Sequence, residues 1–451
     1  MAGPGPTLFW YPATAGDGSC MADVPAAGLR RALGFAELTA SGVGIIVGAG
    51  VYVLIGAATK EAGEQVWLAF TAAGVLSAIT ALSYSELASM FPRASAEYEY
   101  TRNAFPGWFA FVVGWVMVAG LVVAAAAVAL GFARYLGQFT DLPERVGALL
   151  LLALVTSVAL GGIKNSARLT VALSALQVGG LLLIVGVGIT HVDGTRLSSG
   201  HGAGGVLSAA ALVFFAFIGF DEVITLSEET RDPARTVPRA LLAALALSAL
   251  LYVAVAIVAV SVLGAPGLAA SERPLADVMG HVVGGVSVDV VAVIALVSTT
   301  NTTLLALTAG SRLAYGMASQ GAFPAPLARV SRRGVPAVTV GLCAVAAAGF
   351  VLVGNVSVVA GVTDFAVYLV FLAVNATVVI LRVRRPGAAR PFRVPWAFGA
   401  IPVLPLLGFA STVLMMTGLE LKPLAIGGTV VAVGLVLSLV FSVSARRRKP
   451  A

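Results

Sequence analysis

Residues 41–52 read Ser-Gly-Val-Gly-Ile-Ile-Val-Gly-Ala-Gly-Val-Tyr, an apolar run with four glycines within nine residues. A glycine inside a helix costs about 1 kcal/mol relative to alanine, so this run needs a physical reason. One interpretation is close packing, because small residues let membrane helices approach one another. The other is a discontinuous helix, in which a break at Gly48-Ala49-Gly50 frees backbone N–H groups that can hold a carboxylate.

The composition places this run in a membrane protein. Of the 451 residues, 59% are hydrophobic and 11% are charged, whereas soluble domains carry about 25% charged residues. Crossing a bilayer as a helix takes about 20 apolar residues, and a β-barrel would instead alternate polar and apolar residues. About twelve runs qualify as helices, near residues 36–59, 66–90, 108–136, 146–162, 168–190, 205–227, 239–263, 285–311, 336–354, 357–381, 398–418 and 424–444. We expect an all-α, polytopic membrane protein.

The chain divides into a membrane core with two short tails. Residues 1–28 are rich in Gly, Pro and Ala and lack the pattern of a signal peptide, so we expect a disordered tail in which Met21 is a candidate start. Residues 29–385 form the expected ten-helix core, and residues 386–445 two additional transmembrane helices. Residues 446–451 form an expected basic cytoplasmic tail.

The basic residues predict the orientation. If the N-terminus is cytoplasmic, 22 of the 28 Lys and Arg residues fall in cytoplasmic segments. This asymmetry predicts a multi-pass protein of the cell membrane with both termini in the cytoplasm. It also explains the net charge of +7 without nucleic acid, since basic residues face an anionic leaflet. Two Cys and three widely spaced His residues indicate neither a disulfide framework nor a metal site.

A second interruption lies in the sixth run. Residues 214–222 read Phe-Phe-Ala-Phe-Ile-Gly-Phe-Asp-Glu, which combines a glycine with a carboxylate pair in an apolar run. Burying such charge is expensive and usually marks function, although Asp221 and Glu222 could also lie near a wetted helix end. The first and sixth runs correspond if runs 1–5 and 6–10 form two halves. Paired interruptions of this kind predict the binding site of an inverted-repeat transporter.

Several stretches together carry a family resemblance. They are residues 44–54, 81–87, 91–94, 97–100, 214–220, 227–239 and 311–318. With these motifs the chain resembles the amino acid–polyamine–organocation superfamily of permeases. The resemblance implies the leucine-transporter-type fold, with inverted repeats at about 35–190 and 205–382 followed by two extra helices. It also implies secondary active transport of an amino acid by alternating access.

The resemblance implies a substrate site between unwound helices 1 and 6. The α-carboxylate would bind the N–H groups of Gly48, Ala49 and Gly50. The α-ammonium would bind carbonyls of Ile45 or Ile46 and of Phe215, Ala216 and Ile218. This division agrees with helix electrostatics, because helix N-termini favour anions and C-termini favour cations. Phe215 and Phe217 would shield the substrate, with Phe217 as a gate, although simple packing explains them as well.

The residues expected to couple transport to an ion leave several possibilities open. Proton-coupled relatives carry a Lys in helix 5 where this chain has Gln177, and Gln does not titrate near neutral pH. Thr299 and Thr300 lie in a hydroxyl-rich run of helix 8 and could hold Na⁺ with helix 1 carbonyls, because hard cations prefer oxygen. Alternatively they bond to their own helix. Coupling to H⁺, coupling to Na⁺ and exchange without a driving ion all remain, and no other cofactor or metal is expected.

Asp364 lies in an apolar run of helix 10. The resemblance places it near the substrate side chain, where it would select Lys, Arg or a polyamine and make the protein a cationic exchanger. A structural role, or a wetted position, is the alternative. Helix 3 contains no acidic residue between Gly114 and Leu130, which weakens a purely cationic interpretation.

Other functions are less consistent with the sequence. A membrane enzyme would need a catalytic set of residues or a P-loop, and the sequence shows neither. An ion channel would need a filter loop or rings of charged residues, and the sequence shows neither of these. A non-transporting, amino-acid-binding membrane receptor is the remaining rival. The expected partners are an amino acid and the lipid bilayer, and the sequence does not specify an oligomeric state.

Overall fold

The computed structural model describes six segments of the chain. These are residues 33–91, 96–161, 166–197, 200–225, 230–331 and 334–447. The expected N-terminal tail 1–28, with Met21, lies outside the described residues, as do residues 448–451 of the expected basic tail.

Apolar helices of membrane-spanning length dominate the described residues. Nine qualify by length and composition, and a tenth results if the bent pair α1 (Phe35–Ile46) and α2 (Gly50–Ala62) is one span. The nine are α3 (Val66–Met90), α5 (Gly107–Leu136), α6 (Glu144–Gly161), α7 (Ser166–Gly188), α8 (Gly202–Val213) with the residues up to Ile224, α10 (Pro233–Ala270), α12 (Gly285–Ser319), α14 (Val356–Arg384) and α16 (Leu421–Arg447). Two shorter apolar helices, α13 (Ala337–Val351) and α15 (Val403–Thr417), bring the total to the twelve expected.

The remaining described elements are short. The helical ones are α4 (Ala96–Ala104), η2 (Ile189–His191), η3 (Gly194–Leu197), η4 (Phe214–Phe217), α9 (Glu222–Thr225), α11 (Pro274–Val282) and η6 (Ala325–Ala328). Strands β1 (Ala397–Phe398) and β2 (Ile401–Pro402) form one antiparallel hairpin between α14 and α15, and Phe398 pairs with Ile401. With so little strand in the described residues, the all-α, polytopic prediction is confirmed.

The helices pair across the two halves of the core. α2 packs on α8, α3 on α10, α5 on α12 and α6 on α13, so each of spans 1–4 contacts the span five positions later. Successive spans alternate in direction, so two spans five positions apart run antiparallel. This is the packing expected of two inverted five-helix repeats. The boundaries of the repeats stay a prediction.

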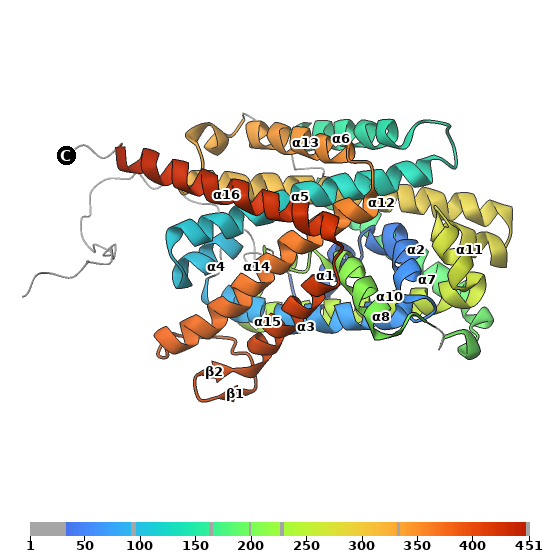
Figure 1. Ribbon diagram of the computed structural model, residues 1–451, viewed down its shortest axis with the longest axis horizontal. Helices are drawn as coiled ribbons and strands as arrows, with labels where there is room; N and C mark the ends of the chain where they lie inside the picture. Colours follow the sequence, from blue (N-terminus) through green and yellow to red (C-terminus); the bar gives the residue numbers. More distant parts are fainter. Residues whose placement is uncertain are drawn as a thin grey trace, which may run out of the picture.

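Helix α5 contacts helices of both halves, and in Figure 1 α6 and α13 lie along one side of it and the β1–β2 hairpin toward the opposite side. It packs against α6, α12, α13, α14 and α16, and most of its side chains are buried. Its many glycines and alanines allow these close approaches. α5 therefore forms a wall on which the helices of both halves are positioned.

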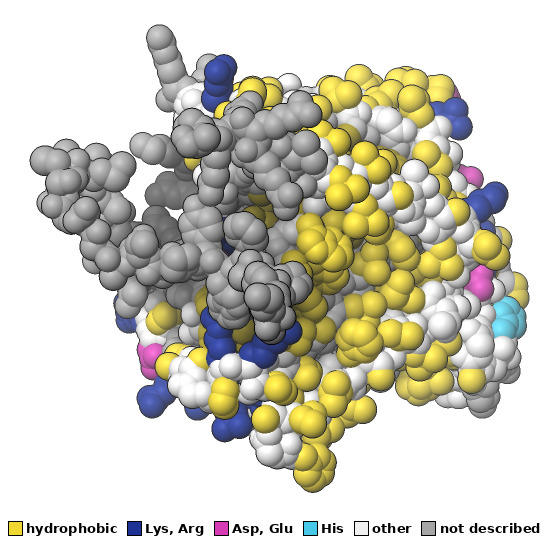
Figure 2. Space-filling model, turned by 60° about the vertical axis from the view of Figure 1, so that its left-hand side comes forward, with side chains coloured by type: hydrophobic (Ala, Val, Ile, Leu, Met, Phe, Trp, Pro, Cys, Tyr) yellow, Lys and Arg dark blue, Asp and Glu magenta, His cyan; other side chains and the backbone are white. Residues whose placement is uncertain are grey.

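The outer helices expose large apolar side chains. Leu150 and Leu154 on α6, Val345 on α13 and Leu439 on α16 are between 55% and 72% exposed. The face shown in Figure 2 carries hydrophobic side chains over much of its described surface. An apolar surface of this extent would not be stable in water, and it fits contact with lipid.

Candidate functional site

The first interruption expected from the sequence is a break in the structure. α1 ends at Ile46, α2 begins at Gly50, and the two helices differ in direction by 51°. The last carbonyl groups of α1 and the first N–H groups of α2 lack a partner within their own helices. The break therefore presents a partly negative helix end next to a partly positive one.

The sixth span is interrupted as well. α8 ends at Val213, a 3₁₀ turn covers Phe214–Phe217, and helix resumes only at Glu222. Gly219 has φ of +110°, a conformation that residues with a side chain rarely adopt. Phe215, Ala216 and Ile218, whose carbonyls are expected to accept hydrogen bonds from the ammonium group, all lie in this irregular segment.

The two breaks lie against each other. A Cβ built on Gly50 would be 2.5 Å from the Cα of Ala216, so only a glycine fits at this contact. The hydroxyl of Tyr252, on α10, lies 2.8 Å from the Ile46 carbonyl oxygen and 2.9 Å from that of Ala216. One side chain thus bridges carbonyls of both interruptions.

Two of the N–H groups expected to hold a carboxylate already have acceptors in this conformation. The amide of Gly48 donates to the Ile46 carbonyl at 2.7 Å. The amide of Ala49 donates to the hydroxyl of Thr302, on α12, at 3.1 Å. The first N–H groups of α2, beginning with Gly50, have no acceptor within α2 because they belong to its first turn.

Gln177, on α7, fills the space next to the carbonyl end of α1. Its amide nitrogen donates to the Gly44 carbonyl at 2.9 Å and also to the Val47 carbonyl. Its side-chain oxygen accepts from the hydroxyl of Ser298 at 3.1 Å, and Tyr52 donates to its backbone carbonyl at 3.0 Å. A neutral amide thus makes the contacts with α1 carbonyls that a bound cation could make.

The hydroxyls of Thr299 and Thr300 bond within their own helix. Thr299 donates to the Ala295 carbonyl at 2.7 Å, and Thr300 to the Leu296 carbonyl at the same distance. Two other side chains of α12 make contacts at the first break: Ser298 donates to the side chain of Gln177, and Thr302 accepts from the amide of Ala49. An ion-binding role for Thr299 and Thr300 stays a prediction.

Asp364, on α14, is completely buried. Neither of its carboxylate oxygens has a hydrogen-bond partner among the described residues. Tyr368, one turn further along, donates its hydroxyl to the Ala211 carbonyl at 3.0 Å. A buried carboxylate is stable only when a proton or a cation neutralises it, because an isolated buried charge is very costly.

The two aromatic residues expected near the substrate are packed differently. Phe217 is fully buried, and its ring meets that of Tyr252 edge to face with centroids 5.2 Å apart. Phe215 lies in a second apolar cluster with Ala49 and Val53, next to the first break. The gating role of Phe217 stays a prediction.

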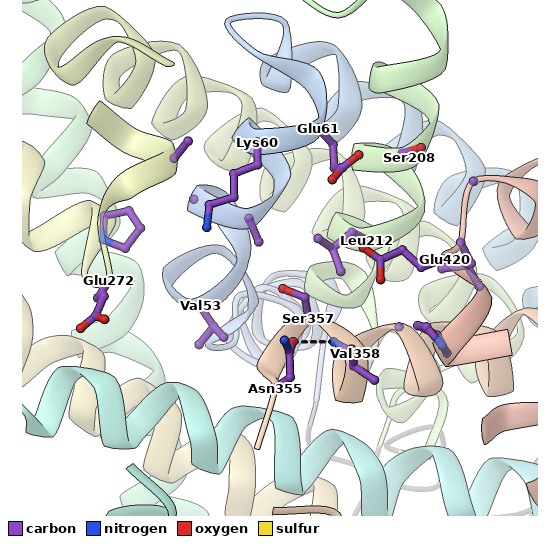
Figure 3. A pocket seen from close by; sticks show the side chains of 18 of the residues that line it. Val53, Lys60, Glu61, Ser208, Leu212, Glu272, Asn355, Ser357, Val358 and Glu420 are labelled. Carbon is purple, nitrogen blue, oxygen red and sulfur yellow. Dashed lines mark hydrogen bonds between the residues drawn. The ribbon is translucent and has the colours of Figure 1, made fainter. Parts of the chain in front are cut away.

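A cavity of about 470 Å³ lies beside the breaks (Figure 3). Its lining includes Lys60, Glu61, Glu272 and Glu420, so charged groups form part of its wall. On the side of the breaks the lining residues are Val53, Leu212 and Gly361. They precede or follow Gly50, Ala216 and Asp364 by three or four residues, about one helical turn. The cavity thus ends next to the candidate site.

A buried carboxylate pair lies near the break in the sixth span. Glu97, on α4, is 5% exposed and accepts a hydrogen bond from Tyr84 at 3.3 Å. Asp221 is 9% exposed. Burial, followed by the charge of Asp221, raises the pKa of Glu97 to about 8. The sequence pointed to Asp221, but it gave no reason to place Glu97 beside it.

Sequence reasoning missed Tyr252, and from the hydroxyl-rich run 298–303 it selected Thr299 and Thr300 and not Ser298 and Thr302. A signal for Tyr252 exists, because a buried tyrosine hydroxyl usually has a hydrogen-bond partner and this tyrosine stands in the apolar run 239–263. For the two hydroxyl residues of α12 no signal distinguishes them from their neighbours.

Comparison with known proteins gives consistent matches over the membrane core. A family model described as amino acid permease matches residues 33–442. The methylthioribose transporter of Bacillus subtilis (strain 168) is 28% identical over 402 residues, which are 84% of this chain and 86% of that protein. The branched-chain amino acid permease BcaP of the same strain is 28% identical over 415 residues, or 87% and 88%. Cationic amino acid transporter 4, vacuolar, of Arabidopsis thaliana is 31% identical over 385 residues, or 78% and 64%.

Proposed function

This chain belongs to the amino acid permease family and is a multi-pass membrane protein, and from this premise we propose that it is a secondary transporter that carries amino acids by alternating access. Its relatives are named as transporters and permeases, not as enzymes. The cargo is an amino acid held by its charged ends at the two breaks.

The observation that carries this proposal is the meeting of the two breaks. Gly50 and Ala216 lie in close contact, and Tyr252 contacts a carbonyl from each break. The first turn of α2 supplies N–H groups for a carboxylate, and the end of α1 with the irregular segment of the sixth span supplies carbonyls for an ammonium group. A zwitterion matches both sets, whereas an uncharged solute matches neither.

In this proposal, contacts within the protein involve groups that the substrate would otherwise bind. The Tyr252 hydroxyl has one hydrogen and two carbonyl neighbours, Ile46 and Ala216, so it satisfies only one of them at a time. An ammonium group has three donors and would serve both carbonyls. Thr302 likewise occupies the amide of Ala49, which a carboxylate oxygen would replace.

A second candidate concerns the class of amino acid. Asp364 is completely buried, and its oxygens have no partner among the described residues, one turn from Gly361 in the cavity wall. A cationic side chain of the substrate would provide the missing counter-charge, which makes a cationic amino acid or polyamine exchanger the specific alternative. The resemblance to a plant cationic amino acid transporter agrees with it, and the resemblance to BcaP favours an apolar side chain.

The contacts of Gln177 favour transport that is not driven by a cation bound at the end of α1. The amide already donates to the carbonyls of Gly44 and Val47, where a bound Na⁺ or a protonated lysine would otherwise lie. A neutral amide neither gains nor loses a proton near neutral pH. If no cation binds at this position, the protein works as an exchanger or as a facilitator.

The proposed orientation has both termini in the cytoplasm of the cell. The described basic residues agree with it, because Arg382, Arg384, Arg385, Arg390 and Arg393 follow one another at the end of α14. In Figure 1, α4 and the C-terminal end of α16 lie toward the left and α11 lies toward the right. Figure 2 turns the left side forward and shows Lys and Arg gathered at the lower left.

Uptake of radiolabelled amino acids into proteoliposomes tests the proposal. We expect leucine or lysine to enter vesicles that contain the protein and to exchange with unlabelled amino acid inside. A pH gradient and a Na⁺ gradient are imposed separately, to distinguish the coupling modes. Binding of an amino acid without flux under any gradient would instead identify the receptor alternative.

A further inference from the structure

Arginine side chains line a separate cavity at the end of α14, away from the candidate substrate site. Its volume is about 250 Å³, and its walls are formed by Arg382, Pro386, Arg390, Arg393 and the Gly399-Ala400 turn of the β1–β2 hairpin. Three of these side chains carry a positive charge. A lining of this kind is suited to an anion.

The positive charge at this cavity exceeds the negative charge that neutralises it. Arg382 and Arg390 are 2% and 7% exposed, and both form an ion pair with the single carboxylate of Glu86, on α3, although only Arg382 donates hydrogen bonds to it. The Arg382 Nε–Glu86 distance is 2.9 Å, and the Arg390 Nε–Glu86 distance is 3.3 Å. One carboxylate between two guanidinium groups leaves a buried positive charge, and the exposed Arg393 adds another.

No acidic residue nearby in the sequence restores the balance. Between Asp364 and Glu420 the chain contains no Asp or Glu. Arg384 and Arg385 donate to neutral acceptors of the α4 region, at 3.1 Å and 3.5 Å. The excess of positive charge is therefore a property of this whole end of α14.

Arg382 also has an unused donor. Its Nη1 atom is buried and has no hydrogen-bond partner among the described residues, while its Nε and Nη2 are bonded to Glu86. Leaving a buried charged donor unpaired is energetically unfavourable. Because Arg382 lines the cavity, an anion with several oxygens placed there would accept this bond. Guanidinium groups bind phosphate oxygens particularly well.

Exposed aromatic side chains beside the cavity indicate where such an anion comes from. Trp396 is 73% exposed, and Phe398 is 82% exposed on the hairpin that contributes Gly399 and Ala400. The hairpin joins α14 to α15, so it lies where the chain leaves and re-enters the membrane. Aromatic residues at this level lie among lipid headgroups, and basic pockets there bind anionic lipids.

We propose that this cavity binds the phosphate group of an anionic membrane lipid, whose remainder lies along Trp396 and Phe398. The phosphate oxygens accept from Arg382 Nη1 and pair with Arg393. Because the Glu86–Arg382 pair joins α3 to α14, the lipid stabilises the contact between these two helices. This site is independent of the cargo and of the transport mechanism.

Thermal unfolding of the full-length protein in detergent tests this site. The probes are phosphatidylglycerol, phosphatidylcholine of the same chain length, and inorganic phosphate. We expect phosphatidylglycerol to raise the melting temperature in a saturable way and phosphatidylcholine to leave it unchanged. Equal stabilisation by both lipids would overturn the proposal, and full stabilisation by inorganic phosphate alone would show a site for a soluble anion instead.

Three variants identify the residues. Arg393→Gln should weaken the apparent affinity for phosphatidylglycerol about fivefold, the factor that corresponds to about 1 kcal/mol for one basic residue at an anionic surface. Arg329→Gln, an exposed arginine outside the cavity, should bind like the wild type. Phe398→Ala should weaken binding of the lipid. Unchanged affinity in both Arg393→Gln and Phe398→Ala would refute the assignment.

Discussion

A Cβ atom on Gly50 would lie 2.5 Å from the Cα of Ala216, closer than folded proteins allow. The contact joins the start of α2 to the irregular segment of the sixth span. Since the nearest atoms belong to the backbone of Ala216, no side-chain rotation relieves the clash. The geometry of the two breaks therefore depends on a missing side chain.

The first prediction concerns this glycine. Gly50→Ala should reduce the initial rate of amino acid uptake at least tenfold, because the two breaks must separate by about 1 Å. In enzymes, a misplacement of about 1 Å can lower the reaction rate about 100-fold. The rate is measured in proteoliposomes at equal protein content. Gly341→Ala is the matched control, since nothing lies within 4 Å of a Cβ at Gly341 on α13. Wild-type transport by Gly50→Ala would mean that the contact is irrelevant to transport.

The second prediction concerns coupling. Uptake by the wild type should not respond to an inward proton or Na⁺ gradient, because the amide of Gln177 donates to the carbonyls of Gly44 and Val47 and does not titrate. Gln177→Lys should make uptake depend on the proton gradient, since an ammonium group donates to these carbonyls only while it is protonated. Gln138→Lys, which lies beyond the end of α5, is the control. A wild type that already accumulates substrate on a proton gradient would contradict this role of Gln177.

The third prediction concerns selectivity. If Asp364 pairs with a cationic substrate, Asp364→Asn should reduce lysine uptake at least tenfold, as expected when one partner of a buried charge pair is removed at a cost of about 2–5 kcal/mol. Leucine uptake should change much less, because its side chain needs no counter-charge. Asp141→Asn, at an exposed position, controls for the loss of a negative charge. An unchanged ratio of lysine to leucine uptake would exclude Asp364 as the selective residue.

The fourth prediction concerns pH. Burial and the charge of Asp221 raise the pKa of Glu97 from 4.5 to about 8. Between these values the folded state holds a proton that the unfolded state has released, so the free energy of unfolding decreases as the pH rises from about 4.5 to about 8. The melting temperature should therefore be lower at pH 8 than at pH 6.

Two variants on the same helix check the source of this dependence. Glu97→Gln should make the melting temperature less sensitive to pH over this range, because a neutral amide replaces one of the titrating groups. Glu99→Gln, two residues away and less buried, should keep the dependence of the wild type. The same pH slope in Glu97→Gln and the wild type would show that another group titrates.

The sequence predicted the membrane class and the position of both breaks, because these depend on local signals. A glycine-rich apolar run predicts a break at Gly48-Ala49-Gly50 without knowledge of its neighbours. The resemblance of short motifs then supplied the relation between the first and the sixth span. Only the structure shows that Gly50 and Ala216 are in contact.

The side chains that complete the site could not be predicted in the same way. Residues 298–303 of α12 are all Ser, Thr or Asn, and successive residues rotate by about 100° around a helix. Ser298 and Thr302, four residues apart, share the face that meets Gln177 and Ala49. Thr299, on another face, bonds to its own helix. Nothing in the sequence fixes which face points to the break.

Tyr252 illustrates the same limit across a larger distance. It lies 206 residues from Ile46 and 36 from Ala216, yet it contacts both. Packing of α10 against α1 and α3 places it there. Such a contact depends on the tertiary arrangement of three helices, which no local pattern encodes.

The groups proposed to hold the cargo belong mainly to the backbone, and this affects how the site responds to mutation. Every amino acid except proline retains its N–H and every amino acid retains its carbonyl, so an alanine scan of residues 45–50 would underestimate their contribution. Replacing a single amide by an ester at Gly50 removes the hydrogen-bond donor and keeps the shape, and so reveals that contribution directly. The same property lets the side-chain pocket diverge while the contacts to the charged ends of an amino acid are kept, which fits relatives named for branched-chain and for cationic amino acids.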